Sequence, residues 1–186
     1  KNNSNILEEF LHGIELKSYE FNKYKSKKKN LLIKINISVS KKTSNLNKNI
    51  KYKALVEGTN FARDLVSEPP NVLTPKEYVN RLIKLKKYGL KVTVYNEVKL
   101  KKLKMFSLLG VGQGSINESF LVTIEWYGNK KNKSKPLSFV GKGVCFDTGG
   151  ISLKPARFME EMKYDMAGSA VVAGLLKNLA IRKSKI

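Results

Sequence analysis

The stretch that decides the fold is SFVGKGVCFDTGGISLKPARFMEEMKYDMAGSAVVAGLLKNLA, residues 138–180. It begins like the end of a buried strand, continues as a glycine-punctuated loop, and ends in a small-residue helix expected over residues 167–180. Glycine tolerates positive φ angles and close backbone approach, which a site wrapped around an ion or a substrate requires. The segment therefore predicts a charged functional site. Its charged candidates are Lys142, Asp147, Lys154 and Asp165.

Working outward from this stretch, strands and helices alternate from residue 50 onward. A helix is expected over Ile50–Val66, and a capping box that begins at Thr74 starts a second helix, which Gly89 ends. Alternating strands and helices predict an α/β fold: a helix-covered, mostly parallel mixed sheet whose site loop follows the carboxyl end of a central strand. The remaining expected elements are a strand at Lys91–Tyr95, a Lys-rich helix begun by Asn96, a glycine-rich turn at Met105–Ser115, and strands at Phe120–Tyr127 and Pro136–Val140.

Residues 1–49 have a different character from the rest of the chain. The alternating run Leu31–Val39 predicts a strand, and the polar residues 40–49 predict a connector. One or two strands and a short helix cannot close a core by themselves. We therefore expect residues 1–49 to be the end of a smaller α/β N-terminal domain plus a linker, and residues 50–186 to be the N-terminal part of a truncated catalytic domain.

The composition of the chain indicates where in the cell the protein is located. The chain has 186 residues, of which 41% are hydrophobic, and no apolar run is long enough to span a membrane. Its first residues lack the basic-then-apolar pattern of a secretory signal. Cys145 is the single cysteine, which excludes an internal disulfide and fits a reducing compartment. We expect a cytoplasmic protein with no membrane partner.

The net charge of +21 favours an alternative function, a basic nucleic-acid-binding module. The excess is nearly all lysine, scattered in runs such as Lys84–Lys87, whereas arginine, which contacts phosphates and bases bidentately, is scarce. Lysine-rich solvated faces explain this charge at least as well as a binding groove. Nucleic acid is therefore the weaker hypothesis.

Several of the candidate residues have structural explanations that need no chemistry. Asp165 stands where a helix begins, so it could be a helix cap, and the two lysines could simply pair with the two aspartates. Cys145 fits a buried structural thiol, because His12, the only histidine, lies in the peripheral N-terminal part. Met159 and Met162 are either core residues or pocket lining. The sequence FDTGG at 146–150 is similar to the aspartic-protease turn and is kept as a minor alternative.

Taken together, the motifs resemble one family. VGKGVCFDTGGISLKP followed by MKYDMAGSA resembles the leucyl (cytosol) aminopeptidases, peptidase family M17, of the bacterial type. Upstream, GTNFARDLVSEPPNVLTP resembles the segment that opens their catalytic domain, and LLGVGQGS their glycine turn. The resemblance covers residues 50–181 well and 1–49 loosely.

This resemblance implies a metallo-exopeptidase that uses two divalent metal ions, Zn²⁺ or Mn²⁺ or also Mg²⁺, to activate a water. By position, it makes Lys142 an amine ligand, Asp147 a bridging carboxylate and Asp165 a ligand of the second metal. Lys154 would be the catalytic lysine that holds the substrate carbonyl, and Met162, with Met159, would line the side-chain pocket. The implied substrates are peptides with a free N-terminus, and the implied assembly is a homo-oligomer, a hexamer in the family.

The chain departs from the family in one respect. The family's Asn-Thr-Asp-Ala-Glu-Gly-Arg motif, which brings two more metal carboxylates and an arginine, does not occur in it. We therefore expect an internal fragment with part of the metal site and no peptidase activity of its own. A further hypothesis is a catalytically inactive family member that keeps its metal ligands.

Overall fold

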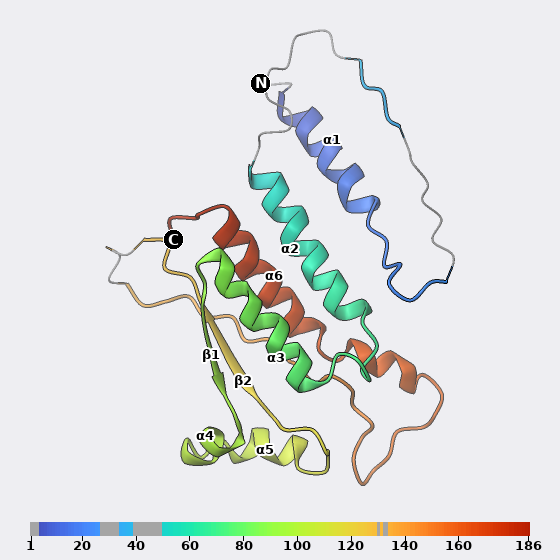
Figure 1. Ribbon diagram of the computed structural model, residues 1–186, viewed down its shortest axis with the longest axis vertical. Coiled ribbons are helices and arrows are strands. Elements are labelled where there is room, and N and C mark those ends of the chain that lie inside the picture. The colour runs from blue at the N-terminus through green and yellow to red at the C-terminus, as the bar shows by residue number, and fades with distance from the viewer. Residues whose placement is uncertain (1–3, 27–33, 39–49, 130, 132–133) are drawn as a thin grey trace.

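The computed structural model describes residues 4–26, 34–38, 50–129, 131 and 134–186. Over these residues the chain forms several helices and one pair of strands (Figure 1). In chain order the elements are α1 (Ser4–Lys17), α2 (Ile50–Ser67), α3 (Pro75–Ile83), η1 (Lys84–Tyr88), β1 (Lys91–Tyr95), α4 (Glu97–Lys102), α5 (Phe106–Gly112), β2 (Leu121–Glu125), η2 (Met159–Tyr164) and α6 (Ala167–Ile181), of which η1 and η2 are 3₁₀ helices.

The centre of the molecule is the contact between α2 and α6, which lie side by side in Figure 1. The two backbones touch at a pair of glycines: a Cβ placed on Gly58 would lie 2.5 Å from the Gly174 carbonyl oxygen, and the converse distance is also 2.5 Å. Small residues bring helices close enough for dense packing, and Ala54 and Ala170 are completely buried here. The small-residue helix expected at 167–180 is thus confirmed, with its role at the core.

A buried charge accompanies this helix pair. The Lys177 side chain on α6 is only 10% exposed, and its Nζ donates to Oε2 of Glu57 on α2 at 2.8 Å and to the Glu57 carbonyl oxygen at 3.1 Å. The hydrogen bond from Lys177 lowers the pKa of the Glu57 carboxyl despite partial burial. The same ammonium lies over the rings of Phe61 and Tyr88, which cover it from solvent.

The predicted helix boundaries around α3 and α4 are confirmed by their caps. Thr74 is the N-cap of α3, and its side chain accepts a hydrogen bond from the Glu77 amide at 3.4 Å. Gly89 ends the following 3₁₀ helix with φ 85°, a left-handed conformation that glycine adopts without strain. Asn96 caps α4 by accepting from the Lys99 amide at 3.2 Å.

The one strand pair in the described part of the chain is antiparallel, which the predicted mostly parallel mixed sheet allows. β1 and β2 pair antiparallel, with Lys91 opposite Glu125 and Tyr95 opposite Leu121. The physical reason is visible in Figure 1: α4 and α5 both lie at the far end of the ribbon, so the chain returns beside β1 in the opposite direction instead of crossing over a sheet face. Helices and strands do share one fold, so the α/β class itself is confirmed.

Other expected elements also differ. Pro136–Val140 forms no strand, because its apolar residues lack a strand neighbour in the described part and Val140 is 98% exposed. The glycine-rich turn expected at Met105–Ser115 contains the helix α5, since Leu108 and Leu109 are half-buried and the helix glycines Gly110 and Gly112 cost only about 1 kcal/mol each. No strand forms over residues 34–38; the rest of the strand expected at Leu31–Val39 and the connector at 40–49 lie outside the described residues.

The N-terminal part packs along α2. The guanidinium of Arg63 donates to the Leu16 carbonyl oxygen at the end of α1, at 2.6 Å, and the Tyr19 hydroxyl donates to Asp64 at 2.9 Å. His12 has a ring contact with Tyr52, with centroids 5.1 Å apart. The division of domains at residue 49 stays a prediction. Among the described helices, none combines the length and apolar character that a membrane crossing needs.

Candidate active site

The loop between residues 141 and 158 is folded back on itself by two glycines. Gly149 and Gly150 have φ angles of 96° and 78°, and a Cβ on Gly149 would lie 2.4 Å from the Ser152 carbonyl oxygen. The Gly149 amide donates to Oδ1 of Asp147 at 2.9 Å, and the Lys154 amide donates to the Thr148 carbonyl oxygen at 2.9 Å. The glycines therefore create the turn that brings the backbone of Lys154 next to Asp147.

The first of two charged pairs joins Lys154 and Asp147. The Lys154 ammonium lies 2.9 Å from Oδ2 of Asp147 and donates a second hydrogen bond to the thioether sulfur of Met162 at 2.9 Å. Met162 is half-buried on η2, which Met159 begins. One carboxylate and one polarisable sulfur thus fix the direction of the ammonium group.

The second pair joins Lys142 and Asp165. The Lys142 Nζ atom lies 2.8 Å from Oδ1 of Asp165, which ends η2. Met166, and not Asp165, occupies the N-cap position of α6, and no side chain caps that helix. The interpretation of Asp165 as a helix cap is therefore wrong.

Electrostatics link the two pairs. The hydrogen bond from Lys154, the Gly149 amide and the charge of Lys142 lower the pKa of the Asp147 carboxyl. The hydrogen bond to Asp165 raises the pKa of Lys142, and the charge of Asp147 adds to this effect. Both carboxylates therefore raise the pKa of Lys142. We call the four linked groups the charge set: Lys142, Asp147, Lys154 and Asp165.

Two observations fit a divalent cation at this set. The Oδ2 atom of Asp165 is buried and has no hydrogen-bond partner, so an acceptor is left for a cation. Carboxylate oxygens and an amine nitrogen are suitable donors for Zn²⁺ and Mn²⁺. Within the part of the chain that the structure describes, no three His, Cys, Asp or Glu side chains form a metal-binding group. The described residues therefore offer part of a ligand set.

Cys145 lies inside this loop but takes no part in the charge set. It is 9% exposed, belongs to the hydrophobic core, and burial raises the pKa of its thiol to about 11. The interpretation as a buried structural thiol is confirmed.

A testable consequence concerns the reactivity of Cys145. Because alkylation requires the thiolate, iodoacetamide at pH 7.5 is expected to modify the folded protein at least ~100-fold more slowly than the urea-unfolded protein. Mass spectrometry of timed samples measures both rates. Equal rates would contradict the burial of the thiol.

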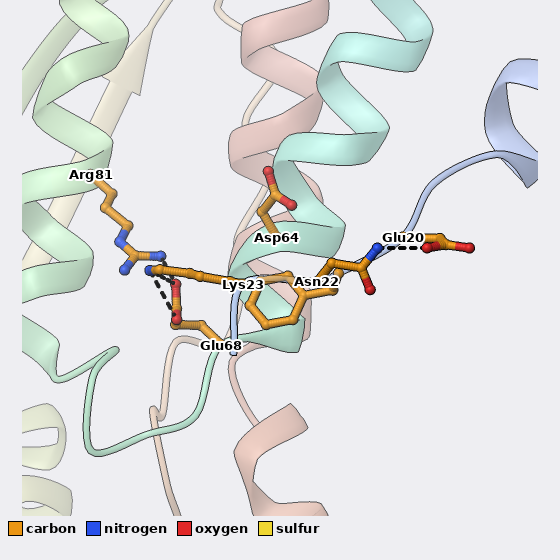
Figure 2. A pocket seen from close by; sticks show the side chains of 7 residues that line it. Glu20, Asn22, Lys23, Asp64, Glu68 and Arg81 are labelled. Atoms are coloured by element: carbon orange, nitrogen blue, oxygen red, sulfur yellow. Dashed lines mark hydrogen bonds and ion pairs between the residues drawn. The ribbon is translucent and has the colours of Figure 1, made fainter. Parts of the chain in front are cut away.

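A second charged cluster, which no local sequence pattern predicts, lies at the C-terminal end of α2. Glu68 is 2% exposed, and its carboxylate accepts hydrogen bonds from Lys23, Tyr24 and Arg81. Figure 2 shows the Lys23 and Arg81 side chains meeting at this carboxylate. Burial alone raises the pKa of Glu68, but the hydrogen bonds outweigh it and the net shift is downward. The partners are 13 to 45 residues away in sequence, so no local pattern identifies them.

A cavity of about 390 Å³ adjoins the cluster, lined by Glu20, Phe21, Asn22, Lys23, Asp64, Glu68 and Arg81.

Replacing this carboxylate should destabilise the fold. We expect Glu68→Gln to lower the free energy of unfolding by about 1–3 kcal/mol, because the hydrogen bonds to a buried carboxylate weaken and Arg81 loses the more buried of its two carboxylate partners. Urea unfolding at pH 7 measures this. Glu77→Gln is the matched control: Glu77 forms a more exposed i,i+4 pair with Arg81, and its loss should cost only a few tenths of a kcal/mol.

The pH dependence has a defined sign. Since the folded-state pKa of Glu68 is lowered, its stabilisation is fully present above the ordinary glutamate pKa and is lost as the pH falls through the lowered value. The stability difference between wild type and Glu68→Gln should therefore shrink in acid. A difference that stays constant or grows would contradict the assignment.

Comparisons with known proteins relate this arrangement to one family. The family model described as "Cytosol aminopeptidase family, catalytic domain" matches residues 60–186, which include both charged pairs. The chain is 48% identical over 180 residues to a "Probable cytosol aminopeptidase" of Brucella ovis and 45% identical over 178 residues to one of Afipia carboxidovorans. Each alignment covers 94% of this chain and 36% of the relative, so the chain spans about a third of the length of the curated relatives it matches.

Solved structures of similar fold were also found. The bottromycin maturation enzyme BotP in complex with Mn is 31% identical, with a TM-score of 0.76, over 95% of this chain and 36% of that one. The cytosol aminopeptidase from Coxiella burnetii is 24% identical, with a TM-score of 0.79, over 98% and 37% of the two chains; this likeness concerns the fold alone.

Proposed function

Because the chain belongs to the cytosol aminopeptidase family, we propose that it is part of a metal-dependent aminopeptidase that releases N-terminal, leucine-type residues from peptides. The observation that carries the proposal is the connected charge set in the matched segment, with its buried, unpartnered Asp165 oxygen. Expected substrates have a free N-terminus.

The residues that would hold two divalent ions are Lys142, Asp147 and Asp165, together with ligands outside the described set. Zn²⁺ and Mn²⁺ are the proposed ions, with Mg²⁺ as a further candidate; the similar BotP enzyme, solved in complex with Mn, supports manganese. When bound, such ions polarise a peptide carbonyl and lower the pKa of an attacking water. Lys142 must lose its proton to act as a ligand, since only a neutral amine has a free lone pair.

Lys154 has a different role in the proposal. Its ammonium donates to the scissile carbonyl oxygen and stabilises the negative charge that develops there. Asp147 and Met162 hold this ammonium before the substrate arrives, so little reorganisation is needed. Met162 and Met159 are proposed to border the pocket for the first side chain of the substrate, since both lie half-buried on η2.

The direct test uses the full-length protein and leucine p-nitroanilide. We expect hydrolysis that a chelator such as 1,10-phenanthroline removes and that added Mn²⁺ or Zn²⁺ restores. The N-acetylated substrate is the matched control and should not be cleaved, because it lacks the free amine. Activity that resists the chelator, or equal cleavage of both substrates, would overturn the proposal.

The isolated 186-residue chain should behave differently from the full-length protein. With two carboxylates and one amine as its only proposed ligands, we expect no measurable peptidase activity from this polypeptide alone. An assay of the purified chain with Mn²⁺ measures this. Turnover by the chain that Lys154→Ala abolishes would contradict the expectation.

Three further features are proposed: a cytoplasmic location and no membrane partner, both from composition, and a homo-hexameric assembly, from the resemblance. A nucleic-acid partner stays the weaker alternative. Gel filtration of the full-length protein tests the hexamer. DNA binding that persists at physiological salt and falls steeply as salt rises would instead support the basic-module hypothesis.

A further inference from the structure

The backbone around Lys142 rests directly on the first turn of α6. A Cβ placed on Gly141 would lie 2.5 Å from the Cα of Ser169 and 2.7 Å from its nitrogen, so no side chain fits between the loop and the helix. The Ser169 amide donates to the Lys142 carbonyl oxygen at 2.9 Å. This bond joins the loop that carries Lys142 to the helix that follows Asp165.

The Ser169 side chain extends this connection to α3. Its hydroxyl donates to the Met166 carbonyl oxygen at 2.8 Å, and its oxygen lies 2.8 Å from the hydroxyl of Tyr78. Since the Ser169 proton is already used, Tyr78 is the donor in the second bond. Tyr78 is 5% exposed, and burial raises the pKa of its phenol to about 12, so it keeps its proton at working pH.

The chain of contacts therefore runs from α3 through two hydroxyl groups to the backbone of Lys142. We propose that Tyr78 and Ser169 are positioning residues that fix the Lys142 loop against α6 and so hold the Lys142 amine beside Asp165. The inference rests on the proposed metal-dependent function, and it adds two residues that touch neither metal nor substrate.

An apolar contact between positions 78 and 169 would not fix the orientation of the first turn of α6. Alanine at 169 would keep the close approach of the loop, and phenylalanine at 78 would fill the same volume. Each would remove the directional bond that selects one orientation of the helix start. Loss of the bond lowers the population of the binding-competent loop, and the apparent metal affinity falls by the same factor.

The test compares Ser169→Ala, Tyr78→Phe and the double variant in the full-length enzyme. Isothermal titration with Mn²⁺ measures affinity well below the unfolding temperature. Tyr78→Phe is expected to bind Mn²⁺ roughly threefold to tenfold more weakly, the effect of one neutral hydrogen bond. Ser169→Ala also loses the bond to the Met166 carbonyl oxygen, so its loss should be at least as large. The double variant should lose no more than the larger single loss, because both residues act through the same bond.

Tyr88→Phe is the matched control, since Tyr88 on η1 also packs against the core and loses only its hydroxyl. It should bind Mn²⁺ like wild type. Amide hydrogen exchange gives a second readout without metal: exchange at residue 169 should accelerate in both single variants and stay unchanged in the control.

The outcomes separate the two proposals. If wild type binds Mn²⁺ and the variants bind it equally well while losing only thermal stability, the hydroxyl groups serve packing and the inference is wrong. If wild type itself binds no divalent metal, the proposed function fails, and the inference fails with it.

Discussion

Lys154→Ala in the full-length protein is expected to lower kcat for leucine p-nitroanilide by about 10²–10³-fold, the usual cost of removing one preorganised oxyanion donor. The Lys154 ammonium is held at 2.9 Å from Asp147 and from the Met162 sulfur, so its position is set before substrate binds. Alanine removes the charge and the donor together. Steady-state kinetics at saturating substrate measures the loss.

A nearby lysine provides the matched control for this prediction. Lys163 lies on η2 and has its ammonium over the Tyr164 ring, outside the charge set. Lys163→Ala should change kcat by less than a factor of two or so. Metal titration of Lys154→Ala should show that the metals still bind, since Lys154 is not a proposed ligand. A kcat within threefold of wild type would remove Lys154 from the mechanism.

Gly174→Val should be among the most destabilising single changes in the chain, costing about 3 kcal/mol or more of the free energy of unfolding. The added atoms would meet the Gly58 carbonyl oxygen at 2.5 Å, and backbone cannot rotate away as a side chain can. Separation of α2 from α6 would also open the core around Ala170 and Ala173. Urea unfolding followed by circular dichroism measures the change.

The matched control is a glycine with free space around it. Gly13 lies inside α1 and would have nothing within 4 Å of an added Cβ. Gly13→Ala should therefore stabilise the protein by roughly 0.5–1 kcal/mol, since alanine favours helix more than glycine. Similar destabilisation by both changes would mean that the glycine contact between α2 and α6 has no special role.

Local signals in the sequence were sufficient for several elements. Thr74 and Asn96 cap their helices as predicted, because a cap depends on residues at most three positions away. The charged candidates were also found, since Lys142, Asp147 and Lys154 share one glycine-rich loop. The structure pairs the two lysines with Asp147 and Asp165, which the structural alternative also expects, so the roles of these residues toward metal and substrate stay predictions.

Features that depend on contacts between distant segments could not be predicted from local sequence patterns. The antiparallel direction of β2 depends on where α4 and α5 lie, and nothing within the five residues of a strand encodes that. The buried Glu68 was missed because its partners Lys23 and Arg81 come from distant segments. Residues 136–140 have a strand-like apolar pattern, but a strand also needs a neighbour to pair with.

The glycine contact between α2 and α6 also has a consequence for synthesis. Residue 174 follows residue 58 by well over a hundred positions, so a ribosome making roughly 5–20 residues per second completes α6 on the order of ten seconds after α2. During that interval the apolar face of α2 has no α6 to cover it. The loop with Lys142, Asp147 and Lys154 is synthesised within the same interval. Gly141 has no packing partner until Ser169 has been synthesised. Assembly of the core and assembly of the charge set are therefore one late event, and a variant that slows the docking of α6 delays both.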